Sequence, residues 1–352
     1  MQPQFEMLVF RYAIRDNSKF KVKEIQKMKK FILNIIGFSA LVVMLALPLD
    51  FLVTNGLKKT EVGDFQIWND IFNSRITGNV VISGSSRATR SISPAILDTV
   101  LSVNSYNLGN DAYYLFMQYA RYQVFAKHNP KPEIIIQTTD FNTLWKTGSI
   151  NKVQYAPYND ALLDSFLREV GFNTVELSTP VYRYFSEFSA IKLGLLNQLG
   201  LDKILYKDRI KYKGYQATNS KWNRRELDNV LKFYDAIKAH NQPEMAVLLD
   251  DFLSECKNSD IQVVMVFVPE YIEAINATES VNATAVLNLY NFLSAKYDFP
   301  FLDYSRDSIC YNPDYFYNAM HLNRIGAELF TQKLARDIDL LGIIKRDKTI
   351  EN

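Results

Sequence analysis

Residues 79–87 read NVVISGSSR, and this stretch carries the pattern that decides the fold. Its first half, Asn79–Ser83, is short and apolar with two valines and an isoleucine, as expected of a strand that is buried on both faces. A turn of small residues, Gly84, Ser85 and Ser86, follows directly, and a helical pattern begins soon after it. A buried strand that passes through such a turn into a helix predicts the first unit of a parallel α/β sheet.

Four further apolar runs alternate with helical patterns along the rest of the chain. The predicted strands are Val103–Asn107, Glu133–Thr138, Gln262–Val268 and Phe299–Tyr304. The predicted helices are Ser93–Leu101, Tyr114–Lys127, Glu244–Cys256, Ala285–Lys296 and Arg324–Leu341. This alternation predicts an α/β protein with a doubly wound, mostly parallel five-stranded sheet of the flavodoxin-like type. Right-handed crossovers would bring the carboxyl ends of its strands to one edge, where sites in such sheets form.

One block breaks the alternation between the third and fourth strands. Residues 143–240 are helix-like and rich in aromatic side chains, so we predict a helical insertion within a single domain of residues 54–352. Its aromatic residues could pack a small core of their own. They could also form a cap over the strand ends or rest on a membrane surface. Residues 54–78 are predicted to form a linker and a first helix.

The longest apolar run covers residues 31–53, FILNIIGFSALVVMLALPLDFLV, and Asp50 is its one charged residue. As a helix it would span about 34 Å, enough to cross the hydrocarbon core of a membrane. A buried core helix is disfavoured because no polar stripe repeats along the run. A cleaved signal peptide is the stronger alternative, but no clear small-x-small cleavage site follows Pro48.

Basic residues before this run set the predicted orientation. Lys27, Lys29 and Lys30 abut its start. The positive-inside rule therefore places residues 1–30 in the cytoplasm as a basic tail and the domain outside, in a single-pass membrane protein. The sequence MKKF at Met28 resembles a natural start, so residues 1–27 could stem from a mis-assigned start codon.

Charge and cysteine content exclude several classes of function. The formal net charge of +2 comes from the N-terminal segment, and the remainder is slightly acidic, which argues against a nucleic-acid partner. Cys256 and Cys310 cannot form a metal site by themselves, and they could be two free thiols or one disulfide. No phosphate-binding or dinucleotide fingerprint is present. We therefore expect neither a metal nor an organic cofactor.

Polar residues follow three of the predicted strands, at the edge where the strand ends should meet. Ser86 ends the first turn, Gly109 lies in the second (Asn107-Leu108-Gly109-Asn110), and Asn142 closes the third (residues 138–142, TTDFN). A serine in a strand-to-helix turn is well placed as a nucleophile if a base lies within hydrogen-bond reach. Such turns also use serine and glycine merely because these residues cap and turn well.

The chain has three histidines, of which one is a candidate base. His128 and His240 lie in polar helix ends, where solvation is expected. His321 lies in residues 316–323, FYNAMHLN, just before the last predicted helix. A base at that place could face the serine of the first turn.

This set of residues resembles the SGNH/GDSL hydrolase superfamily, and in particular a membrane-anchored branch with a G-S-S-R motif in place of G-D-S. Proteins of that branch are similar to those that work beside membrane-bound O-acyltransferases on cell-envelope polysaccharides. The resemblance covers about residues 78–340, apart from the insertion. It implies Ser86 as nucleophile, Ser85 at the position of the motif's Asp, Gly109 as an oxyanion donor and His321 as base.

Two positions depart from the family pattern. The acid expected three residues before the histidine is replaced by Asn318, which can orient an imidazole but cannot stabilise its charge. Asp314 or Asp140 could supply the acid instead, or a Ser–His dyad could suffice. At the third block, direct alignment gives Asp140, whereas a shift of two residues gives Asn142. We favour Asn142, because a carboxylate would repel an oxyanion.

Two arginines follow the serine. Arg87 and Arg90 could bind an anionic part of a substrate, or they could pair with the domain's own acids. The resulting hypothesis is a membrane-anchored serine esterase or O-acyltransferase that acts on an acylated envelope glycan or another acylated substrate, with a membrane-bound O-acyltransferase as a possible partner. The alternative is a catalytically degenerate SGNH-like module that binds a glycan or a protein partner.

Overall fold

A computed structural model describes residues 2–145, 151–236, 242–278 and 283–344. Its centre is a five-stranded parallel sheet in the order β2-β1-β3-β4-β5. The strands are β1 (Val80–Ser83), β2 (Ser105–Asn107), β3 (Ile134–Thr139), β4 (Gln262–Phe267) and β5 (Phe301–Asp303). All five predicted strands are confirmed to within two residues at each end. The strand order 2-1-3-4-5 is that of the flavodoxin-like doubly wound folds.

Strand register separates the apolar side chains into two layers. Ile82 pairs with Ile136, which pairs with Val264, and the side chains of all three enter one core cluster. Their neighbours Val81, Ile135 and Val263 enter the other cluster. Because side chains alternate across a strand, a run that is apolar throughout fills both faces. The sheet therefore needs a helical layer on each side.

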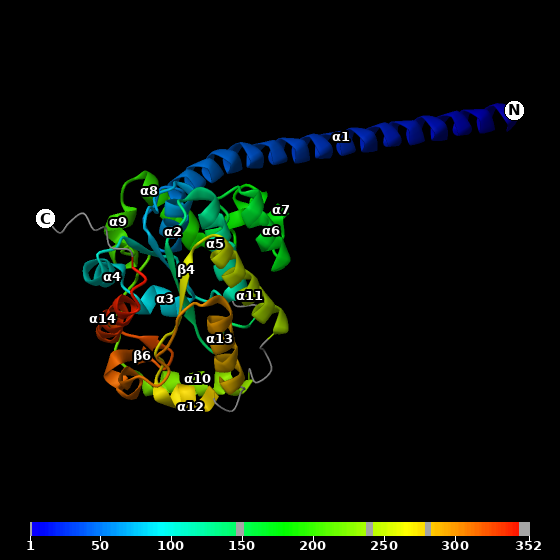
Figure 1. Ribbon diagram of the computed structural model, residues 1–352. Helices are drawn as coiled ribbons and strands as arrows, with labels where there is room; N and C mark the ends of the chain where they lie inside the picture. Colours follow the sequence, from blue (N-terminus) through cyan, green and yellow to red (C-terminus); the bar gives the residue numbers. More distant parts are fainter. Residues whose placement is uncertain (1, 146–150, 237–241, 279–282, 345–352) are drawn as a thin grey trace.

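Helices supply these two layers (Figure 1). The first cluster is closed by α2 (Asp64–Phe72), α5 (Leu115–His128), α11 (Pro243–Asn258) and α13 (Ala283–Tyr297). The second is closed by α3 (Ser86–Ser91), α4 (Pro94–Leu101) and α14 (Arg324–Leu340). The predicted helices agree with α4, α5, α11, α13 and α14, and the α/β class with a doubly wound sheet is confirmed.

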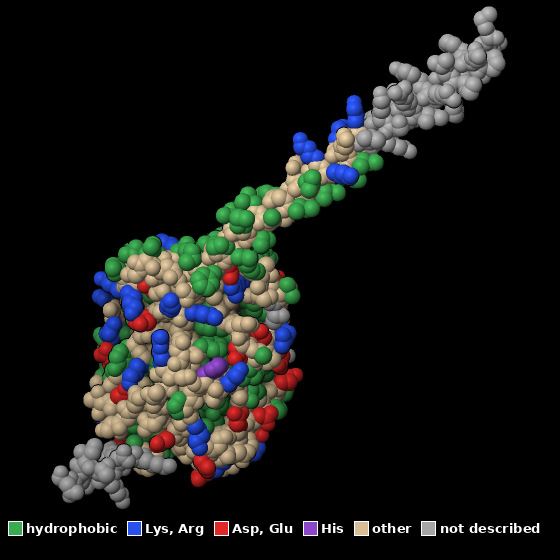
Figure 2. Space-filling model, turned by 90° about the horizontal axis from the view of Figure 1, so that it is seen from above, with side chains coloured by type: hydrophobic (Ala, Val, Ile, Leu, Met, Phe, Trp, Pro, Cys, Tyr) green, Lys and Arg blue, Asp and Glu red, His purple; other side chains and the backbone are tan. Residues whose placement is uncertain are grey.

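Helix α1 (Gln2–Leu57) extends far beyond the domain (Figure 1). Its part from Lys23 to Leu57 is long and apolar enough to cross a membrane, with a mean hydropathy of 2.4 over an 18-residue window that is 0% buried. Figure 2 shows its hydrophobic side chains facing outward along this length. The exposed surface argues against a buried core helix, whereas an anchor and a signal sequence both fit the length and composition.

The end of α1 is built into the domain, which the predicted linker from residue 54 did not anticipate. Asp50, the one charge in the apolar run, is buried and pairs with Arg183. Thr54 shares a hydrogen bond of 2.7 Å with the hydroxyl of Tyr184. A Cβ on Gly56 would lie 1.9 Å from the carbonyl oxygen of Gly194 in α8 (Phe188–Gln198), so these two glycines let the helix backbones touch. The charge inside the apolar run therefore belongs to the junction between helix and domain.

The residues between β3 and β4 form a series of short helices. They are α6 (Ala161–Glu169), α7 (Thr174–Ser178), η2 (Tyr182–Tyr184), α8 (Phe188–Gln198), α9 (Asp202–Leu205) and α10 (Arg224–Ala236). Helix α6 packs on α5, α8 packs on α1, and α10 packs on α12 (Ile272–Thr278) and β6 (Phe316–Asn318). The insertion thus spreads over three places: the side of α5, the base of α1 and the region of the strand ends. Its exact boundaries stay a prediction.

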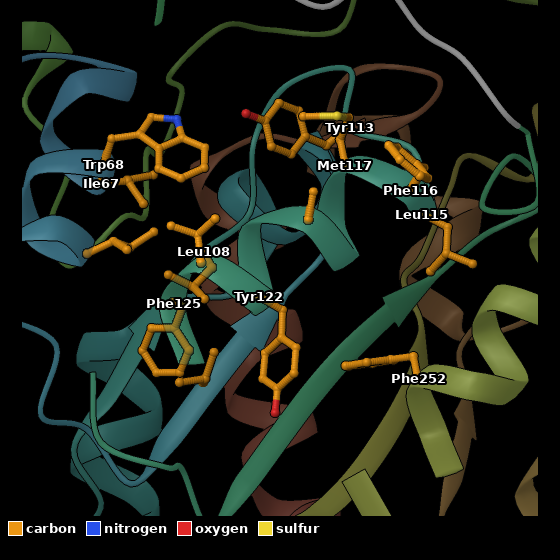
Figure 3. Packing of buried hydrophobic residues seen from close by; sticks show 14 of the residues in the cluster. Ile67, Trp68, Leu108, Tyr113, Leu115, Phe116, Met117, Tyr122, Phe125 and Phe252 are labelled. Carbon is orange, nitrogen blue, oxygen red and sulfur yellow. The ribbon is translucent and has the colours of Figure 1, made fainter. Parts of the chain in front are cut away.

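Aromatic side chains fill the layer between α5 and its neighbours. Trp68, Tyr122, Phe125 and Phe252 are each less than 4% exposed and lie together there (Figure 3). Tyr122 packs edge-on against Phe252, with ring centroids 5.2 Å apart and planes at 73°. This packing joins α2, α5 and α11 into one layer. The layer covers the face of the sheet opposite to α3 and α14.

The two cysteines are free thiols and both are buried. Burial raises the pKa of each thiol to about 12. The sequence allowed either two free thiols or one disulfide between Cys256 and Cys310. The structure has two free thiols. Among the residues that the structure describes, no group of three or more His, Cys, Asp or Glu side chains is placed to hold a metal ion.

Candidate functional site

The turn after β1 places Ser86 at the start of a helix. Gly84 has no room for a side chain, because a Cβ there would lie 1.8 Å from the hydroxyl oxygen of Thr138. Ser85 then caps α3, and its hydroxyl accepts the backbone N–H of Arg87 at 3.3 Å. Ser86 is the first residue of α3, where backbone N–H groups have no partner within the helix. The turn therefore fixes the serine at the carboxyl end of β1.

A small hairpin holds His321. Strands β6 and β7 (His321–Leu322) are antiparallel, and Asn318 pairs with His321 across them. The side-chain oxygen of Asn318 accepts the backbone N–H of Met320 at 3.0 Å, which closes the turn. Asn323 then caps α14 by accepting the N–H of Gly326 at 3.1 Å. The histidine thus stands on a rigid turn directly before the last helix.

The two turns meet. Ser86 Oγ lies 2.7 Å from His321 Nε2, and His321 Nδ1 lies 3.0 Å from Asn318 Oδ1. Because Asn318 Oδ1 also accepts the N–H of Met320, it is the amide oxygen and not the nitrogen that faces the ring. Nδ1 therefore carries the hydrogen, and Nε2 is left to accept the proton of the serine hydroxyl. The geometry is that of a nucleophile, a base and an orienting group.

The imidazole also has a partner on its face. The ring of Tyr317 stacks on His321 with centroids 5.4 Å apart and planes at 13°. The guanidinium of Arg90 lies 5.8 Å from the centre of the Tyr317 ring and pairs with Asp111 at 2.6 Å. Desolvation, with the positive charges of Arg87 and Arg90 nearby, lowers the pKa of His321 well below its ordinary value of 6.5. The histidine is therefore held neutral, as a base must be before it takes a proton.

Arg87 lies beside the serine but points into the protein. Its guanidinium pairs with Asp140 at 3.0 Å and with Glu270 at 2.8 Å. The side chains of Arg87, Asp140 and Glu270 are 2%, 9% and 0% exposed. Of the two alternatives given for Arg87, the structure therefore has the ion pair with the domain's own acids. Asp140 is one of the two carboxylates in this cluster. Glu270, which was not among the predicted site residues, follows β4 at the same edge of the sheet.

Removal of Arg87 is expected to destabilise the protein strongly. The substitution Arg87→Met would leave two buried carboxylates without their shared cation, which typically costs about 3–5 kcal/mol. Arg324→Met removes an exposed pair at 3.9 Å with Glu328, so a loss of at most about 1 kcal/mol is expected for this control. Urea unfolding followed by circular dichroism compares the two. Equal losses in the free energy of unfolding would show that the Arg87 cluster stabilises the protein no more than an exposed ion pair does.

Neither alternative acid reaches the imidazole. Asp314 is exposed, and its backbone carbonyl accepts the amide of Asn323 at 2.7 Å. Asp140 is held by Arg87. The position beside Nδ1 is occupied by Asn318, so the structure presents a serine–histidine pair that is oriented by a neutral amide.

A cavity of about 440 Å³ opens beside Ser86. Its lining combines polar and aromatic side chains from five parts of the fold. They are Ser85, Ser86, Arg87, Ala112, Tyr113, Tyr114, Gln118, Asp140, Asn142, Thr143, Asn229 and Met320. Asn229 belongs to α10, so one helix of the insertion does reach this cavity. A small acyl group or a sugar ring would fit a space of this size.

The two predicted oxyanion residues are placed differently. Asn142 lines the cavity, and its side-chain oxygen is buried without a hydrogen-bond partner in the described part of the chain. Rotation of the amide exchanges this oxygen for the NH₂ group, so Asn142 can present a donor to a ligand. The N–H of Gly109 donates instead to the side chain of Asn107 at 2.9 Å. A Cβ on Gly109 would lie 2.7 Å from that of Ala88, so this glycine lets the loop after β2 approach α3.

The other histidines lie elsewhere. His128 is partly exposed and lies 3.4 Å from the carboxylate of Asp160. His240 lies outside the described residues. Of the residues predicted for the site, the structure brings together Ser86, His321, Asn318 and Asn142, and it places Arg87 and Arg90 in ion pairs at its border. Tyr317 and Glu270 are the neighbours that sequence reasoning missed.

Comparison with protein-family models finds no match, and no curated protein matches the chain. Among solved structures, the chain is similar to a G-D-S-L family protein of inferred lipolytic activity from Desulfitobacterium hafniense DCB-2. The two share 11% sequence identity at a TM-score of 0.35, and the match covers 73% of this chain and 97% of that one. The α/β fold class given above rests on the strand order and register of this chain itself.

Proposed function

We propose that this protein is a membrane-anchored serine esterase or O-acyltransferase that acts outside the cytoplasm on an acylated envelope glycan. The observation that carries the proposal is the hydrogen bond of 2.7 Å between Ser86 Oγ and His321 Nε2, together with the cavity of about 440 Å³ that Ser86 lines. A second support is the neutral histidine, whose pKa is lowered by desolvation and by two arginines. Both are properties that a nucleophile and its base need.

In the proposed reaction, Ser86 Oγ attacks the carbonyl carbon of an acyl ester while His321 Nε2 takes the hydroxyl proton. The negative charge then forms on the carbonyl oxygen. The backbone N–H of Ser86 and the amide of Asn142 would hold it, since Ser86 begins α3 and Asn142 lines the cavity. The N–H of Gly109 would first have to leave Asn107. Collapse of the intermediate expels the alcohol, which takes the proton from His321. Water or a sugar hydroxyl then attacks the acyl carbon while His321 Nε2 takes its proton. The ester bond to Ser86 Oγ breaks, and His321 returns the proton to Ser86.

Two features favour an envelope glycan as the substrate. Tyr114, Gln118, Asn142, Thr143 and Asn229 give the cavity an aromatic and polar lining that suits a hydroxyl-rich ligand. Helix α1 would hold the site beside the membrane, near a membrane-bound acyl donor, with its basic end in the cytoplasm. A membrane-bound O-acyltransferase is the partner that this arrangement would serve.

Fluorophosphonate labelling tests the proposal on the intact chain. The probe reacts with serines that a base activates, so the wild-type protein should be labelled at Ser86 and Ser86→Ala should not be labelled at all. Ser165→Ala is the matched control, because Ser165 is exposed on α6 and its hydroxyl donates to the backbone carbonyl of Leu162 at 2.7 Å. Labelling that persists unchanged in Ser86→Ala, with the fold intact by circular dichroism, would contradict the proposal.

The pH dependence should report the lowered pKa of His321. The base must be neutral, and its pKa in the folded protein lies below 6.5. We therefore expect kcat/KM for p-nitrophenyl acetate to stay constant as the pH falls to 6.5 and to decline only at lower pH. Stability should decline over the same acid range, since the unfolded chain takes up this proton first, at its higher pKa. An acid limb of kcat/KM centred above pH 6.5 would contradict this account.

The second candidate function is a binding module without catalysis, and Asn318 is the observation that favours it. A neutral amide 3.0 Å from Nδ1 orients the ring but leaves an imidazolium without a counter-charge. In that case the cavity would bind a glycan or a protein partner, and Ser86 would not react with the probe. The labelling experiment therefore separates the two functions.

A further inference from the structure

The domain carries exposed apolar side chains around the base of α1. Six of them belong to η2, α8 and the segment that follows: Tyr182, Phe185, Phe188, Leu199, Ile204 and Leu205, which we call the collar. Each is between 52% and 70% exposed. Large apolar side chains gathered on one surface mark a contact site rather than chance exposure. Figure 2 shows hydrophobic side chains gathered where α1 meets the domain.

The collar is attached directly to the last turns of α1. Tyr182 and Phe185 flank Arg183, which binds Asp50, and Tyr184, which binds Thr54. At the other end of α8, the amide of Gln198 donates to the carbonyl of Leu52 at 3.0 Å, next to Leu199. The collar is thus continuous with the apolar surface of α1, where Phe51 is 66% exposed.

The length of the apolar part of α1 predicts that the collar lies at one surface of the membrane. Asp50 is buried against Arg183, so the part of α1 that can lie in lipid ends just before it. The basic residues Lys29 and Lys30 mark the opposite end. The residues between them would span about 28 Å as a helix, close to the thickness of a hydrocarbon core. The collar therefore lies at the level where the helix would leave the bilayer.

Charge beside the collar fits a lipid surface. Lys58, Lys59, Lys192, Lys207 and Arg209 are exposed on the segments that carry the collar or follow α1. Aromatic rings at a membrane interface with basic residues next to them are the composition by which proteins rest on anionic lipid. Tyr182 and Phe185 stack at 6.0 Å, and Phe185 and Phe188 pack edge-on at 5.7 Å, so the three rings form one surface.

We infer that the collar lies in the outer surface of the same bilayer that α1 crosses, and that it holds the domain in a fixed orientation on anionic lipid. This inference rests on the proposed crossing of the membrane by α1. It does not depend on the chemistry of Ser86. The occupant of the collar is the lipid interface, and neither a second copy of the chain nor a protein partner is needed.

Spin labels on the full-length protein in vesicles of phosphatidylcholine and phosphatidylglycerol test the inference. Single cysteines would be placed by Phe188→Cys and Leu199→Cys in the collar, by Val42→Cys in α1 and by Phe292→Cys on α13. Phe292 is 62% exposed and belongs to a different surface, so it is the matched control. Cys256 and Cys310 are both 0% exposed and should not take up the label. Collisions with oxygen, which enters lipid, are compared with collisions with a water-soluble nickel chelate.

The inference predicts that the labels at residues 188 and 199 favour oxygen over nickel several-fold more than the label at 292. The label at 42 should favour oxygen as well. If the label at 42 lies in lipid but those at 188 and 199 behave like that at 292, the collar does not contact the membrane. If the label at 42 meets nickel freely, α1 does not cross the bilayer and the anchor itself is wrong. Dipolar broadening between collar labels would reveal a second copy of the chain and would also overturn the inference.

Discussion

Replacement of Asn318 by aspartate is expected to increase the proposed esterase activity by up to about 10⁴-fold. Asn318 Oδ1 already lies 3.0 Å from His321 Nδ1, so a carboxylate at this place would take over the hydrogen bond and add a negative charge. In a serine triad the reverse change, from aspartate to asparagine, costs about 10⁴ in rate. The gain should appear in kcat for p-nitrophenyl acetate, because the imidazolium forms only in the reaction.

A second effect of Asn318→Asp distinguishes this mechanism from a general change in the site. The new carboxylate favours the protonated imidazole, so the pKa of His321 should rise from its lowered value, and the acid limb of kcat/KM should move to higher pH with it. Asn312→Asp is the matched control. Asn312 caps the short helix before β6 by accepting the N–H of Asp314 at 3.0 Å, a role that aspartate fills equally well. An equal gain in both variants, or none in Asn318→Asp, would show that His321 does not act as a base.

Replacement of Ser86 or His321 by alanine is expected to reduce kcat by about 10²-fold, by the same factor for each and for the double variant. Removal of the serine or histidine from a complete triad costs about 10⁶, and the losses are not additive because the two residues act as one unit. A site without the acid already lacks a factor of about 10⁴ of the triad's rate acceleration. Roughly 10² therefore remains to be lost.

The same two substitutions in the Asn318→Asp background sharpen this prediction. With the acid restored, loss of Ser86 should cost about 10⁶ instead of about 10². Stopped-flow or plate assays with p-nitrophenyl acetate measure both cases against the uncatalysed rate. Losses that add up in the double variant, or that stay the same size in both backgrounds, would mean that Ser86, His321 and residue 318 do not form one catalytic unit.

The sheet could be predicted from the sequence because its strands are apolar throughout and are followed by helices. Val80–Ser83 (VVIS) and Gln262–Phe267 (QVVMVF) show this pattern most strongly, and both lie in the parallel sheet. The hairpin of β6 and β7 could not be predicted in this way. Its strands have three and two residues, too few to show an alternation, although they carry Asn318 and His321. The end of α1 was also missed: the apolar run was predicted to end at Val53, before the polar residues Thr54 and Asn55, whereas the helix continues to Leu57.

Several residues of the candidate site could be singled out from the sequence, but their contacts could not. Ser86, His321 and Asn142 stand out as polar residues after strands or before a helix, and a shared sheet edge brings such residues together. The partners of Arg87 could not be predicted, because its ion pairs with Asp140 and Glu270 form only where three turns of the chain meet in space. Glu270 could have been noted as the first charged residue after β4. No pattern in the sequence predicts that the ring of Tyr317 stacks on that of His321.

Trapping of an acyl-enzyme tests the central claim most directly. The full-length protein would be mixed with p-nitrophenyl acetate, quenched in acid within its first turnovers and digested for peptide mass spectrometry. The account predicts an acetyl group on Ser86, formed more slowly and to a lesser extent in His321→Ala and absent from Ser86→Ala. Acetylation that is confined to lysines or to other serines, with the peptide of Ser86 unmodified throughout the time course, would contradict it.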